Sequence, residues 1–414
     1  MNKSKLRPII LAGGSGKRLW PLSTKEKQKQ FISLFGEYSL FDLTLQRINK
    51  KSLFKSPIIV TSEKYIRYVE ESIERTGVEP GLIVLEPQSK NTFPAISLAV
   101  MLNSLKNKNE TFFVAPSDHY ISKNKEFHST CLIAKDKVVD GSLMLFGIKP
   151  EMPSPEYGYI LCNRTKGVTN EVIDFVEKPD KDLAKKLLKK PYVFWNAGMF
   201  IFNQEWFLST CKETNLEGLN EISTLIPNKY PDDLYFLPNK ENFKLISDIA
   251  FDKALVEDNN KTLVTQLDAG WSDLGSWTSL RALQKDPESR MTLFTDTYNF
   301  RVEKPWGFYE TIMETDASKV KLISVLPGHK LSLQKHKHRS ETWHVIRGEA
   351  KVTKGNERFC MLIGDSVIIH KNEVHRLEKL SKEPLEIVEI QTGSYFGEDD
   401  IIRIKDLYGR SDLH

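Results

Sequence analysis

Pro8-Ile9-Ile10-Leu11-Ala12-Gly13-Gly14-Ser15-Gly16-Lys17-Arg18 is a short apolar run followed at once by a glycine-rich turn with two cations. Such a run suits a buried β-strand, and glycines allow backbone N–H groups to approach a phosphate chain closely. The turn lacks the Gly-Lys-Ser/Thr ending of a Walker A loop and the full spacing of a dinucleotide-binding loop. By itself it indicates either a phosphate site or a plain tight turn.

From Arg7 to about Lys149, short apolar strands alternate with amphipathic helical segments. This alternation predicts an α/β domain with a Rossmann-like, mostly parallel sheet covered by helices, whose ligands bind at the carboxyl ends of the strands. From Tyr157 to Leu274 the pattern is less regular, as expected of a substrate lobe. The expected strands are Pro8–Ala12, Pro57–Thr61, Leu82–Leu85, Thr111–Pro116 and Ser142–Gly147, and the expected helices are Phe41–Asn49, Lys64–Arg75, Ala95–Leu105 and Glu126–Val139.

The pattern becomes all-β after Phe300. Alternating or β-branched segments with Gly and Asn at the turns predict an antiparallel barrel or jelly roll. Residues 281–299 are polar and lack a clean period, as expected of a linker. We therefore expect a domain at 1–285, a linker at 286–300 and a second domain at 301–414. The strand-like segments are Lys319–Val325, Thr342–Val352, Phe359–Ile369 and Leu385–Gln391.

The bulk composition excludes several classes of protein. A chain of 414 residues exceeds what one hydrophobic core usually serves, so two domains are expected. Lys+Arg 59 against Asp+Glu 55 gives a net charge of +4, too mild to indicate nucleic-acid binding. No apolar segment approaches the length of a membrane span. Four scattered cysteines, without a Cys-x-x-Cys pair, predict a reduced, cytoplasmic protein.

Histidines near the C-terminus form a candidate metal site. His336-Lys337-His338 on a strand would place two imidazoles on one face, because side chains alternate with period two. Glu341 follows around the turn, and His375 can come from a neighbouring strand. Three nitrogens and one carboxylate oxygen suit Zn²⁺ or another divalent first-row metal.

The glycine-rich turn belongs to a longer ordered set of motifs. Its pattern Gly-Gly-x-Gly-x-Arg-Leu-x-Pro-Leu resembles the signature of sugar-1-phosphate nucleotidyltransferases. More closely, the chain is similar to bacterial mannose-1-phosphate guanylyltransferases fused to a type II phosphomannose isomerase, and the resemblance covers nearly all of the first 280 residues. The matching stretches are Lys29-Gln30-Phe31, Glu86-Pro87-Gln88-Ser89-Lys90-Asn91-Thr92, Pro116-Ser117-Asp118-His119, Tyr157-Gly158-Tyr159-Ile160, Phe175-Val176-Glu177-Lys178-Pro179, Trp195-Asn196-Ala197-Gly198-Met199-Phe200 and Trp271-Ser272-Asp273-Leu274-Gly275-Ser276-Trp277.

The resemblance implies attack by a sugar-1-phosphate oxygen on the α-phosphorus of a nucleoside triphosphate. This reaction needs cations and positioning more than covalent chemistry. Arg18 and Lys29 would hold the triphosphate, and Asp118 and Asp273 would hold Mg²⁺. Lys178 would bind the sugar phosphate. The remaining nucleotide-binding residues would be Leu11, Gly13, Gly14, Gly16, Lys17 and Asn91, and the remaining sugar-binding residues Gly158, Glu177 and Asn196.

The chain departs from this family at two positions. Gln28 stands where proline usually precedes the lysine, so the loop carrying Lys29 has less built-in rigidity. Lys90 replaces the commoner arginine, which keeps the charge but loses a bidentate fork.

The C-terminal segment resembles the cupin of type II phosphomannose isomerases. By that resemblance His336, His338, Glu341 and His375 ligate Zn²⁺ or Co²⁺, and the cupin interconverts mannose 6-phosphate and fructose 6-phosphate through an enediolate. Arg403 and Arg410 are candidates to hold the phosphate. The matching stretches are Val302-Glu303-Lys304-Pro305-Trp306-Gly307, Gln334 to Trp343, Gly364 to His370, His375-Arg376-Leu377, Gly397 to Arg403 and Tyr408-Gly409-Arg410.

The resemblance thus predicts a bifunctional, cytoplasmic enzyme that uses GTP, mannose 1-phosphate and the two hexose 6-phosphates, assembles as a homodimer, and binds neither nucleic acid nor membrane. In the family a sizeable β-rich connector joins the domains, whereas about 25 residues separate Trp277 from Val302 here. Two alternatives stay open at this point. The transferase uses another nucleotide or another manno-configured sugar-1-phosphate, or the cupin is a non-catalytic sensor or dimerisation module.

Overall fold

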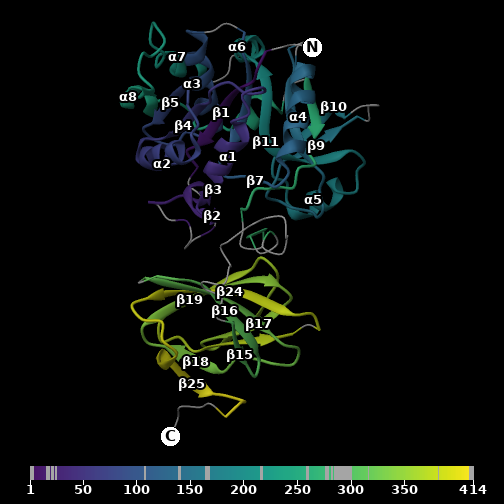
Figure 1. Ribbon diagram of the computed structural model, residues 1–414. Helices are drawn as coiled ribbons and strands as arrows, with labels where there is room; N and C mark the ends of the chain where they lie inside the picture. The colour runs from purple at the N-terminus through teal and green to yellow at the C-terminus, as the bar shows by residue number, and fades with distance from the viewer. Residues whose placement is uncertain are drawn as a thin grey trace. The chain divides into compact units, whose positions relative to one another are not determined.

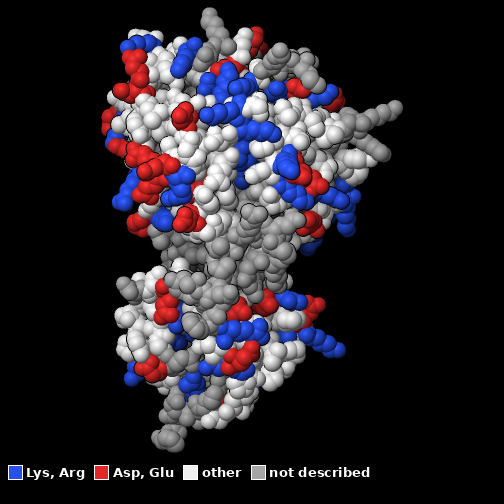
Figure 2. Space-filling model, viewed as in Figure 1, with Lys and Arg blue, Asp and Glu red and all other residues white. Residues whose placement is uncertain are grey.

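Two units make up the chain, with main parts at Glu37–Leu274 and Gly275–His414 (Figure 1). The computed structural model describes residues 4–14, 19, 23, 26–106, 109–138, 141–163, 168–214, 218–257, 261–275, 279–280, 283, 301–315, 317–380 and 382–409. The expected linker at 286–300 lies outside these residues. Within them, no helix combines the length and the apolar character that a membrane span requires. Figure 2 shows basic and acidic side chains on the viewed face of both units, in keeping with the small net charge.

A ten-stranded sheet forms the centre of the N-terminal unit, in the order β12-β5-β4-β1-β6-β11-β8-β13-β10-β9. The first five strands run parallel, and β11 lies antiparallel between β6 and β8. All five predicted strands are present within one residue of their expected bounds. The bounds are β1 Arg7–Ala12, β4 Ile58–Ser62, β5 Leu82–Glu86, β6 Thr111–Pro116, β8 Leu143–Ile148, β9 Tyr159–Cys162, β10 Thr169–Val176, β11 Val193–Asn203, β12 Tyr235–Phe236 and β13 Thr262–Gln266.

Helices cover both faces of this sheet, which gives the Rossmann-like architecture predicted from the strand–helix alternation. Successive residues of β1 point to opposite faces, so Ile9 joins the core formed with α3 while Ile10 joins the core formed with α1 and α4. The four predicted helices are α1 Leu40–Ile48, α2 Ile66–Thr76, α3 Thr92–Ser104 and α4 Asn124–Lys137, and the others are α5 Lys181–Leu187, α6 Gln204–Glu213, α7 Leu219–Ser223, α8 Lys240–Lys244 and α9 Phe251–Leu255.

The C-terminal unit consists of two antiparallel sheets that share one core. A six-stranded sheet has the order β15-β16-β17-β24-β19-β22, and a five-stranded sheet has the order β21-β20-β23-β18-β25. Trp343 and Ile387 of the first sheet pack with Val352 and Leu377 of the second, which is the predicted jelly-roll arrangement. The bounds are β15 Arg301–Lys304, β16 Gly307–Glu314, β17 Ser318–Val325, β18 Leu333–His336, β19 Arg339–Arg347, β20 Ala350–Lys354, β21 Glu357–Met361, β22 Ser366–Ile369, β23 His375–Lys379, β24 Leu385–Gly393 and β25 Ile401–Lys405.

Two of the predicted strand segments each divide into two strands. Residues 342–352 form the end of β19 and the start of β20, because Gly348 turns the chain with φ +76°. Residues 359–369 likewise form β21 and β22, with Gly364 at φ +92° between them. A side chain at position 348 would approach the Pro384 carbonyl oxygen to 2.5 Å, so this turn requires glycine.

Candidate functional sites

Lys29, Asp118 and Asp273 meet at the carboxyl edge of the N-terminal sheet. Asp118 follows β6, the neighbour of β1, and Lys29 begins the 3₁₀ turn Lys29–Phe31. Asp273 follows β14 (Trp271–Ser272), which pairs with β7 (Tyr120–Ile121) two residues after Asp118. Strand pairing therefore joins residues that are 155 positions apart in the chain.

The three residues form one charged cluster. The Lys29 Nζ lies 2.8 Å from Asp118 Oδ2 and donates to the Asp273 backbone carbonyl, although Lys29 is only 3% exposed. Burial alone would raise the pKa of Asp118, but the charge of Lys29 and its hydrogen bond lower that pKa to about 2. Asp118 is thus ionised at neutral pH. Two carboxyl side chains beside a buried lysine fit Mg²⁺ and an anionic ligand.

Aromatic side chains hold both carboxylates in place. The Tyr157 hydroxyl donates to Asp273 Oδ1 at 2.8 Å. The Trp271 indole N–H donates to His119 Nδ1 at 3.2 Å, and the opposite ring nitrogen of His119 lies 3.8 Å from Asp118 Oδ1. The Tyr157 ring also contacts Trp195, with ring centroids 4.8 Å apart. These contacts fix where a cation between the two carboxylates would sit.

The glycine-rich turn begins where β1 ends, beside this cluster. Gln30 donates from Nε2 to the carbonyls of Ala12 and Gly14, which ties the turn to the segment carrying Lys29. Leu11 accepts from Ser117 N at 3.0 Å. A side chain at Gly14 would enter open space, whereas one at Gly13 would lie 3.1 Å from Glu86 Oε2. The predicted nucleotide contacts of Gly16, Lys17 and Arg18 lie outside the described residues.

Glu86 is a site residue that the sequence analysis did not single out. It ends β5, is 4% exposed, and its Oε1 has no hydrogen-bond partner among the described residues. Burial raises its pKa to about 8. Asn91 lies five residues further on, where it caps the start of α3 with a positive φ of 67° and accepts from Thr92 N through its side chain. A buried carboxyl group at the carboxyl edge of the sheet suits a ligand that supplies hydrogen-bond donors.

A second cluster contains the predicted sugar-binding residues. Lys178 Nζ lies 2.8 Å from Glu177 Oε1, and a side chain at Gly158 would approach Glu177 Oε2 to 2.7 Å. Asn196 donates from its backbone N–H to the Gly158 carbonyl at 2.8 Å and from Nδ2 to Asp252 Oδ1 at 2.5 Å. The structure therefore brings all four predicted residues together.

Asp252 of α9 completes this cluster, and no local sequence pattern points to it because its partners are distant in the chain. Burial and the nearby charge of Glu177 raise the pKa of Asp252 to about 6. The neighbours Tyr157 and Gly158 connect this cluster with the first, since Tyr157 binds Asp273 and Gly158 binds Asn196. A ligand that spans both clusters would meet cations and hydroxyl-binding groups in turn.

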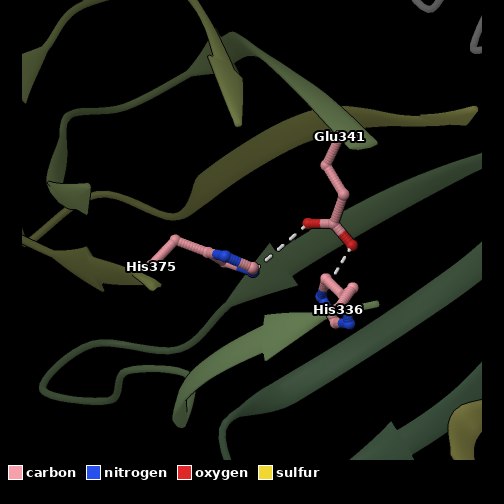
Figure 3. A group of neighbouring side chains, drawn as sticks. All are labelled: His336, Glu341 and His375. Atoms are coloured by element: carbon pink, nitrogen blue, oxygen red, sulfur yellow. Dashed lines mark ion pairs between the residues drawn. The ribbon is translucent and has the colours of Figure 1, made fainter. Parts of the chain in front are cut away.

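The C-terminal unit holds a separate cluster, which we call the cupin cluster, made of His336, Glu341 and His375 (Figure 3). The three side chains come from β18, β19 and β23 and are each no more than 2% exposed. His336 Nε2 lies 3.0 Å from Glu341 Oε1, and His375 Nε2 lies 3.5 Å from Glu341 Oε2. Their ligand atoms lie within 4.8 Å of one another, close enough to share one metal ion.

The chemistry of these donors fits a divalent metal. The His375 Nδ1–H donates to the Glu373 carbonyl at 2.8 Å, which leaves Nε2 as the nitrogen that faces Glu341. This Nε2 is buried and has no hydrogen-bond partner in the described part of the chain. Burial lowers the pKa of His375, so the ring is neutral, the form that binds metals. Although burial opposes it, the charge and hydrogen bond of His336, together with the charge of Arg339, lower the pKa of Glu341 well below its ordinary value.

His338 does not join the cupin cluster, contrary to the alternation argument. β18 ends at His336, so His338 lies in the turn before β19 rather than on the same strand. Its side chain is 56% exposed, and its Nδ1 lies 2.8 Å from Asp400 Oδ1. Asp400 also accepts from the backbone N–H groups of Lys337 and His338. The period-two rule fails here because β18 ends two residues before His338.

Gln334, rather than His338, lies next to His336 in the cupin cluster. It precedes His336 by two residues on β18, is 8% exposed, and its Nε2 lies 3.5 Å from His336 Nε2. The same period-two rule also applies two residues before His336, and there it predicts that Gln334 lies on the same face of β18 as His336. Glu341 is held by three donors around it, namely Arg339 Nε at 3.2 Å, Trp343 Nε1 at 3.1 Å and Gln391 Nε2 at 3.3 Å.

A cavity adjoins the cupin cluster inside the jelly roll. Its wall includes Gln334 and Glu341 together with Arg403, one of the two predicted phosphate-binding arginines. Arg410, the other, lies outside the described residues. Glu389 also faces this cavity, where burial and the charge of Glu341 raise its pKa to about 7.

Two family models match the chain. Residues 7–290 match the model described as nucleotidyl transferase, and residues 294–406 match the model described as mannose-6-phosphate isomerase C-terminal. Only three residues separate the two matches, which agrees with the short connector predicted from the sequence.

The chain is similar to curated proteins over its whole length. It is 33% identical to the xanthan biosynthesis protein XanB of Xanthomonas campestris, with 99% of this chain and 100% of that protein covered. It is 31% identical to a mannose-1-phosphate guanylyltransferase of Salmonella muenchen, with 97% and 98% covered. Among solved structures, mannose-6-phosphate isomerase from Helicobacter pylori is 28% identical with a TM-score of 0.55, covering 65% of this chain and 99% of that one.

Proposed function

The chain belongs to the nucleotidyl transferase family and carries a mannose-6-phosphate isomerase C-terminal domain, and we propose that it transfers GMP from GTP to α-D-mannose 1-phosphate. The observation that carries this proposal is the cluster of Lys29, Asp118 and Asp273 at the carboxyl edge of the sheet. The products would be GDP-mannose and pyrophosphate.

The N-terminal site supports an in-line displacement. A phosphate oxygen of the sugar phosphate forms a bond to the α-phosphorus of the nucleotide, and the bond from that phosphorus to the pyrophosphate oxygen breaks. Lys29 stabilises the negative charge that grows on the leaving pyrophosphate. Asp118 and Asp273 would hold Mg²⁺, which brings the two phosphate groups together and shields their charges when bound. Lys178 would hold the phosphate of the incoming sugar.

Glu86 supports guanine as the base. Burial raises the pKa of Glu86 to about 8 in the unliganded chain, so guanine would bind with release of the Glu86 proton. The ionised carboxylate then accepts two parallel hydrogen bonds, from the adjacent ring N–H and amino group of guanine. Uracil and thymine offer one N–H, and adenine and cytosine present no such adjacent pair of donors on that edge. Glu86 is buried beside Gly13, and within the described part of the chain one of its oxygens has no hydrogen-bond partner, as expected of a group that reads a base. The printed name of the Salmonella relative, a guanylyltransferase acting on mannose 1-phosphate, points to the same pair of substrates.

We further propose that the cupin interconverts mannose 6-phosphate and fructose 6-phosphate. The supporting observation is the buried cupin cluster inside a domain that matches an isomerase family. The ligands would be His336, Glu341 and His375 with Gln334 as the fourth, in place of the predicted His338, and Zn²⁺ or Co²⁺ would suit this set. A divalent metal held by these residues would supply Lewis-acid polarisation of the sugar carbonyl. Arg339, Trp343 and Gln391 orient Glu341.

The transferase proposal is tested by incubating the purified chain and Mg²⁺ with mannose 1-phosphate and each of GTP, ATP, CTP and UTP. Pyrophosphate release and the sugar nucleotide formed are measured for each. We expect GTP to be used at least tenfold better than the others, and Lys29→Met to abolish turnover with all of them. Exposed Lys244 provides the matched control, Lys244→Met, which should behave as wild type. Equal use of a second nucleotide would favour the alternative of a broader transferase.

The chain would act in the cytoplasm, where both substrates are made and reduced cysteines persist. Its assembly as a homodimer stays a prediction, which light scattering on the purified protein would test. A cupin that binds sugar phosphate without turning it over would instead be a sensor, and an assay of mannose 6-phosphate isomerisation separates these two cases.

A further inference from the structure

Lys29 lies in a run of three buried polar residues. Gln28, Lys29 and Gln30 are only 2%, 3% and 2% exposed. Burying a polar side chain is costly unless it is hydrogen-bonded, so each of the three needs a partner. The partners lie on different parts of the N-terminal unit. Gln28 donates to the Tyr65 hydroxyl, Lys29 contacts Asp118 and the Asp273 carbonyl, and Gln30 donates to the Ala12 and Gly14 carbonyls.

Gln28 immediately precedes the 3₁₀ turn Lys29–Phe31. Its backbone is extended, with φ −78° and ψ 159°, and its carbonyl accepts from Phe31 N at 3.0 Å. Its side-chain Nε2 donates to the hydroxyl oxygen of Tyr65, which ends the 3₁₀ turn Glu63–Tyr65 directly after β4. Gln28 therefore joins the segment that carries Lys29 to a turn that follows a strand of the central sheet.

Tyr65 is a fixed anchor for this segment. It is 9% exposed and belongs to the apolar core that contains α1. Phe31, at the far end of the turn, packs against the same tyrosine with ring centroids 6.0 Å apart, and against Phe41 of α1 at 5.5 Å. The Lys29–Phe31 turn is thus attached to Tyr65 on both sides, through a hydrogen bond before it and through ring packing at its end.

We propose that Gln28 and Tyr65 are positioning residues that hold Lys29 where it stabilises the leaving pyrophosphate, an inference that rests on the proposed transferase function. A lysine side chain is a flexible stem, so its charge stays in a defined place only when its backbone is fixed. Loss of the hydrogen bond between Gln28 and Tyr65 would loosen the entry to the turn. Because the charge on pyrophosphate grows in the transition state, the loss should appear in kcat more than in KM for GTP.

The backbone of Gln28 offers a second way to hold the same turn. Proline fixes φ at about −65°, and the φ of −78° at position 28 lies within the range that its ring allows. Gln28→Pro therefore keeps the extended entry without a side-chain partner. If the hydrogen bond serves to fix this entry, the proline variant keeps Lys29 in place and no longer depends on the Tyr65 hydroxyl.

Steady-state kinetics of the full-length protein with Mg²⁺, GTP and mannose 1-phosphate test this inference. We expect Gln28→Ala and Tyr65→Phe each to lower kcat by about tenfold and to change KM for GTP by less than about threefold. The double variant should be no slower than either single variant, because both substitutions remove the same hydrogen bond. Gln28→Pro should keep kcat within about threefold of wild type, with or without Tyr65→Phe.

Matched control variants remove the same chemical groups from exposed places. Gln46→Ala removes a glutamine side chain from α1, and Tyr235→Phe removes the exposed hydrogen bond from Tyr235 to Glu70. Both should have the kcat of wild type. Circular dichroism checks the fold of every variant, and Tyr65→Phe keeps the test open if a Gln28 variant does not fold.

Chemical labelling of the Lys29 amine gives a second measurement that does not need turnover. The nucleotide-free protein is treated with an acetylating N-hydroxysuccinimide ester, and mass spectrometry of peptides follows the modification of Lys29. We expect labelling at least about threefold faster in Gln28→Ala and Tyr65→Phe than in wild type, because a loosened turn exposes the buried amine more often. Labelling in Gln28→Pro should match that of wild type.

Folded Gln28→Ala and Tyr65→Phe variants with wild-type kcat and wild-type labelling of Lys29 would overturn the positioning role. Additive losses in the double variant would also overturn it, as would a folded Gln28→Pro variant as slow as Gln28→Ala. If labelling rises as expected while the wild type makes no GDP-mannose, the positioning role stands and the proposed function fails. If every variant makes GDP-mannose at the wild-type rate and labelling is unchanged, only the positioning role fails.

Discussion

At the scale of single residues, Glu86 links the stability of the unliganded protein to pH. Its carboxyl group has an ordinary pKa of 4.5, and burial raises the pKa to about 8 in the folded chain. The folded state therefore favours the protonated group, and wild-type stability falls as pH rises from 4.5 toward 8. Glu86→Gln removes this loss, because the amide stays neutral.

We predict that Glu86→Gln raises the unfolding free energy of the nucleotide-free protein by on the order of 2 kcal/mol at pH 8, and by less at pH 5.5. Denaturant unfolding at the two pH values measures the difference. GTP should stabilise the wild type more than the variant, because the variant presents one acceptor where guanine needs two. A stability difference that is the same at both pH values would contradict the assignment of a buried, shifted carboxyl group.

His336 and His338 make a matched pair for the cupin cluster. His336→Ala removes a buried ligand and should reduce zinc affinity by about a hundredfold or more, whereas His338→Ala should leave zinc affinity within about threefold. Competition with a chromogenic chelator measures both affinities. Loss of zinc binding in His338→Ala comparable to that in His336→Ala would restore the ligand set first predicted from the sequence.

At the scale of secondary-structure elements, Glu110 joins the start of β1 to α3. It accepts from Arg7 Nε at 2.8 Å, from Lys55 Nζ at 2.7 Å and from Asn103 Nδ2 at 3.0 Å. Burial alone would raise the pKa of Glu110, but these hydrogen bonds and charges lower the pKa to about 2. Its contribution to stability is therefore complete above pH 4.5 and is lost as pH falls toward 2.

We predict that Glu110→Gln destabilises the N-terminal unit by about 2 kcal/mol at pH 7, because it breaks charge-assisted hydrogen bonds to two cations. The deficit should shrink as pH is lowered to 3, where the wild-type carboxylate begins to take up a proton. Glu241→Gln, which breaks an exposed pair with Lys244, should change stability by less than about 0.5 kcal/mol. A deficit that is constant between pH 7 and 3 would show that charge is not its cause.

Element boundaries could be predicted from the sequence where local pattern decides them. The strand at Thr111–Pro116 has the bounds expected from its apolar run. Residues 342–352 were predicted as one strand-like segment, because the single glycine at position 348 does not by itself reveal a left-handed turn. Local patterns do not reveal long-range contacts. Asp252 and Glu86 could therefore be assigned to the site only from the fold, which places Asp252 beside Asn196 and Glu86 beside Gly13. The family resemblance predicted Lys29, Asp118 and Asp273 as site residues, and in the fold Lys29 contacts both aspartates.

At the scale of the whole molecule, the two units have separate cores and separate candidate sites. A ligand stabilises the structure that binds it and not the unfolded chain. We predict that Zn²⁺ slows amide hydrogen exchange in β18, β19 and β23 and leaves exchange in β1, β4 and β6 unchanged. GTP with Mg²⁺ should do the reverse. Mass spectrometry of peptic fragments measures both effects, and protection of both units by Zn²⁺ alone would contradict two independent sites.

One chain carries two chemistries in this account, and turnover at the isomerase site is the sharpest test of that pairing. Purified full-length protein is assayed on mannose 6-phosphate with no added metal, with Zn²⁺ and with Co²⁺, beside His336→Ala. We predict metal-dependent formation of fructose 6-phosphate by the wild type, loss of this activity in His336→Ala, and GDP-mannose formation at the wild-type rate in both proteins. Absence of isomerisation with every metal, while GDP-mannose is still made, would contradict the claim and leave a transferase with a non-catalytic cupin.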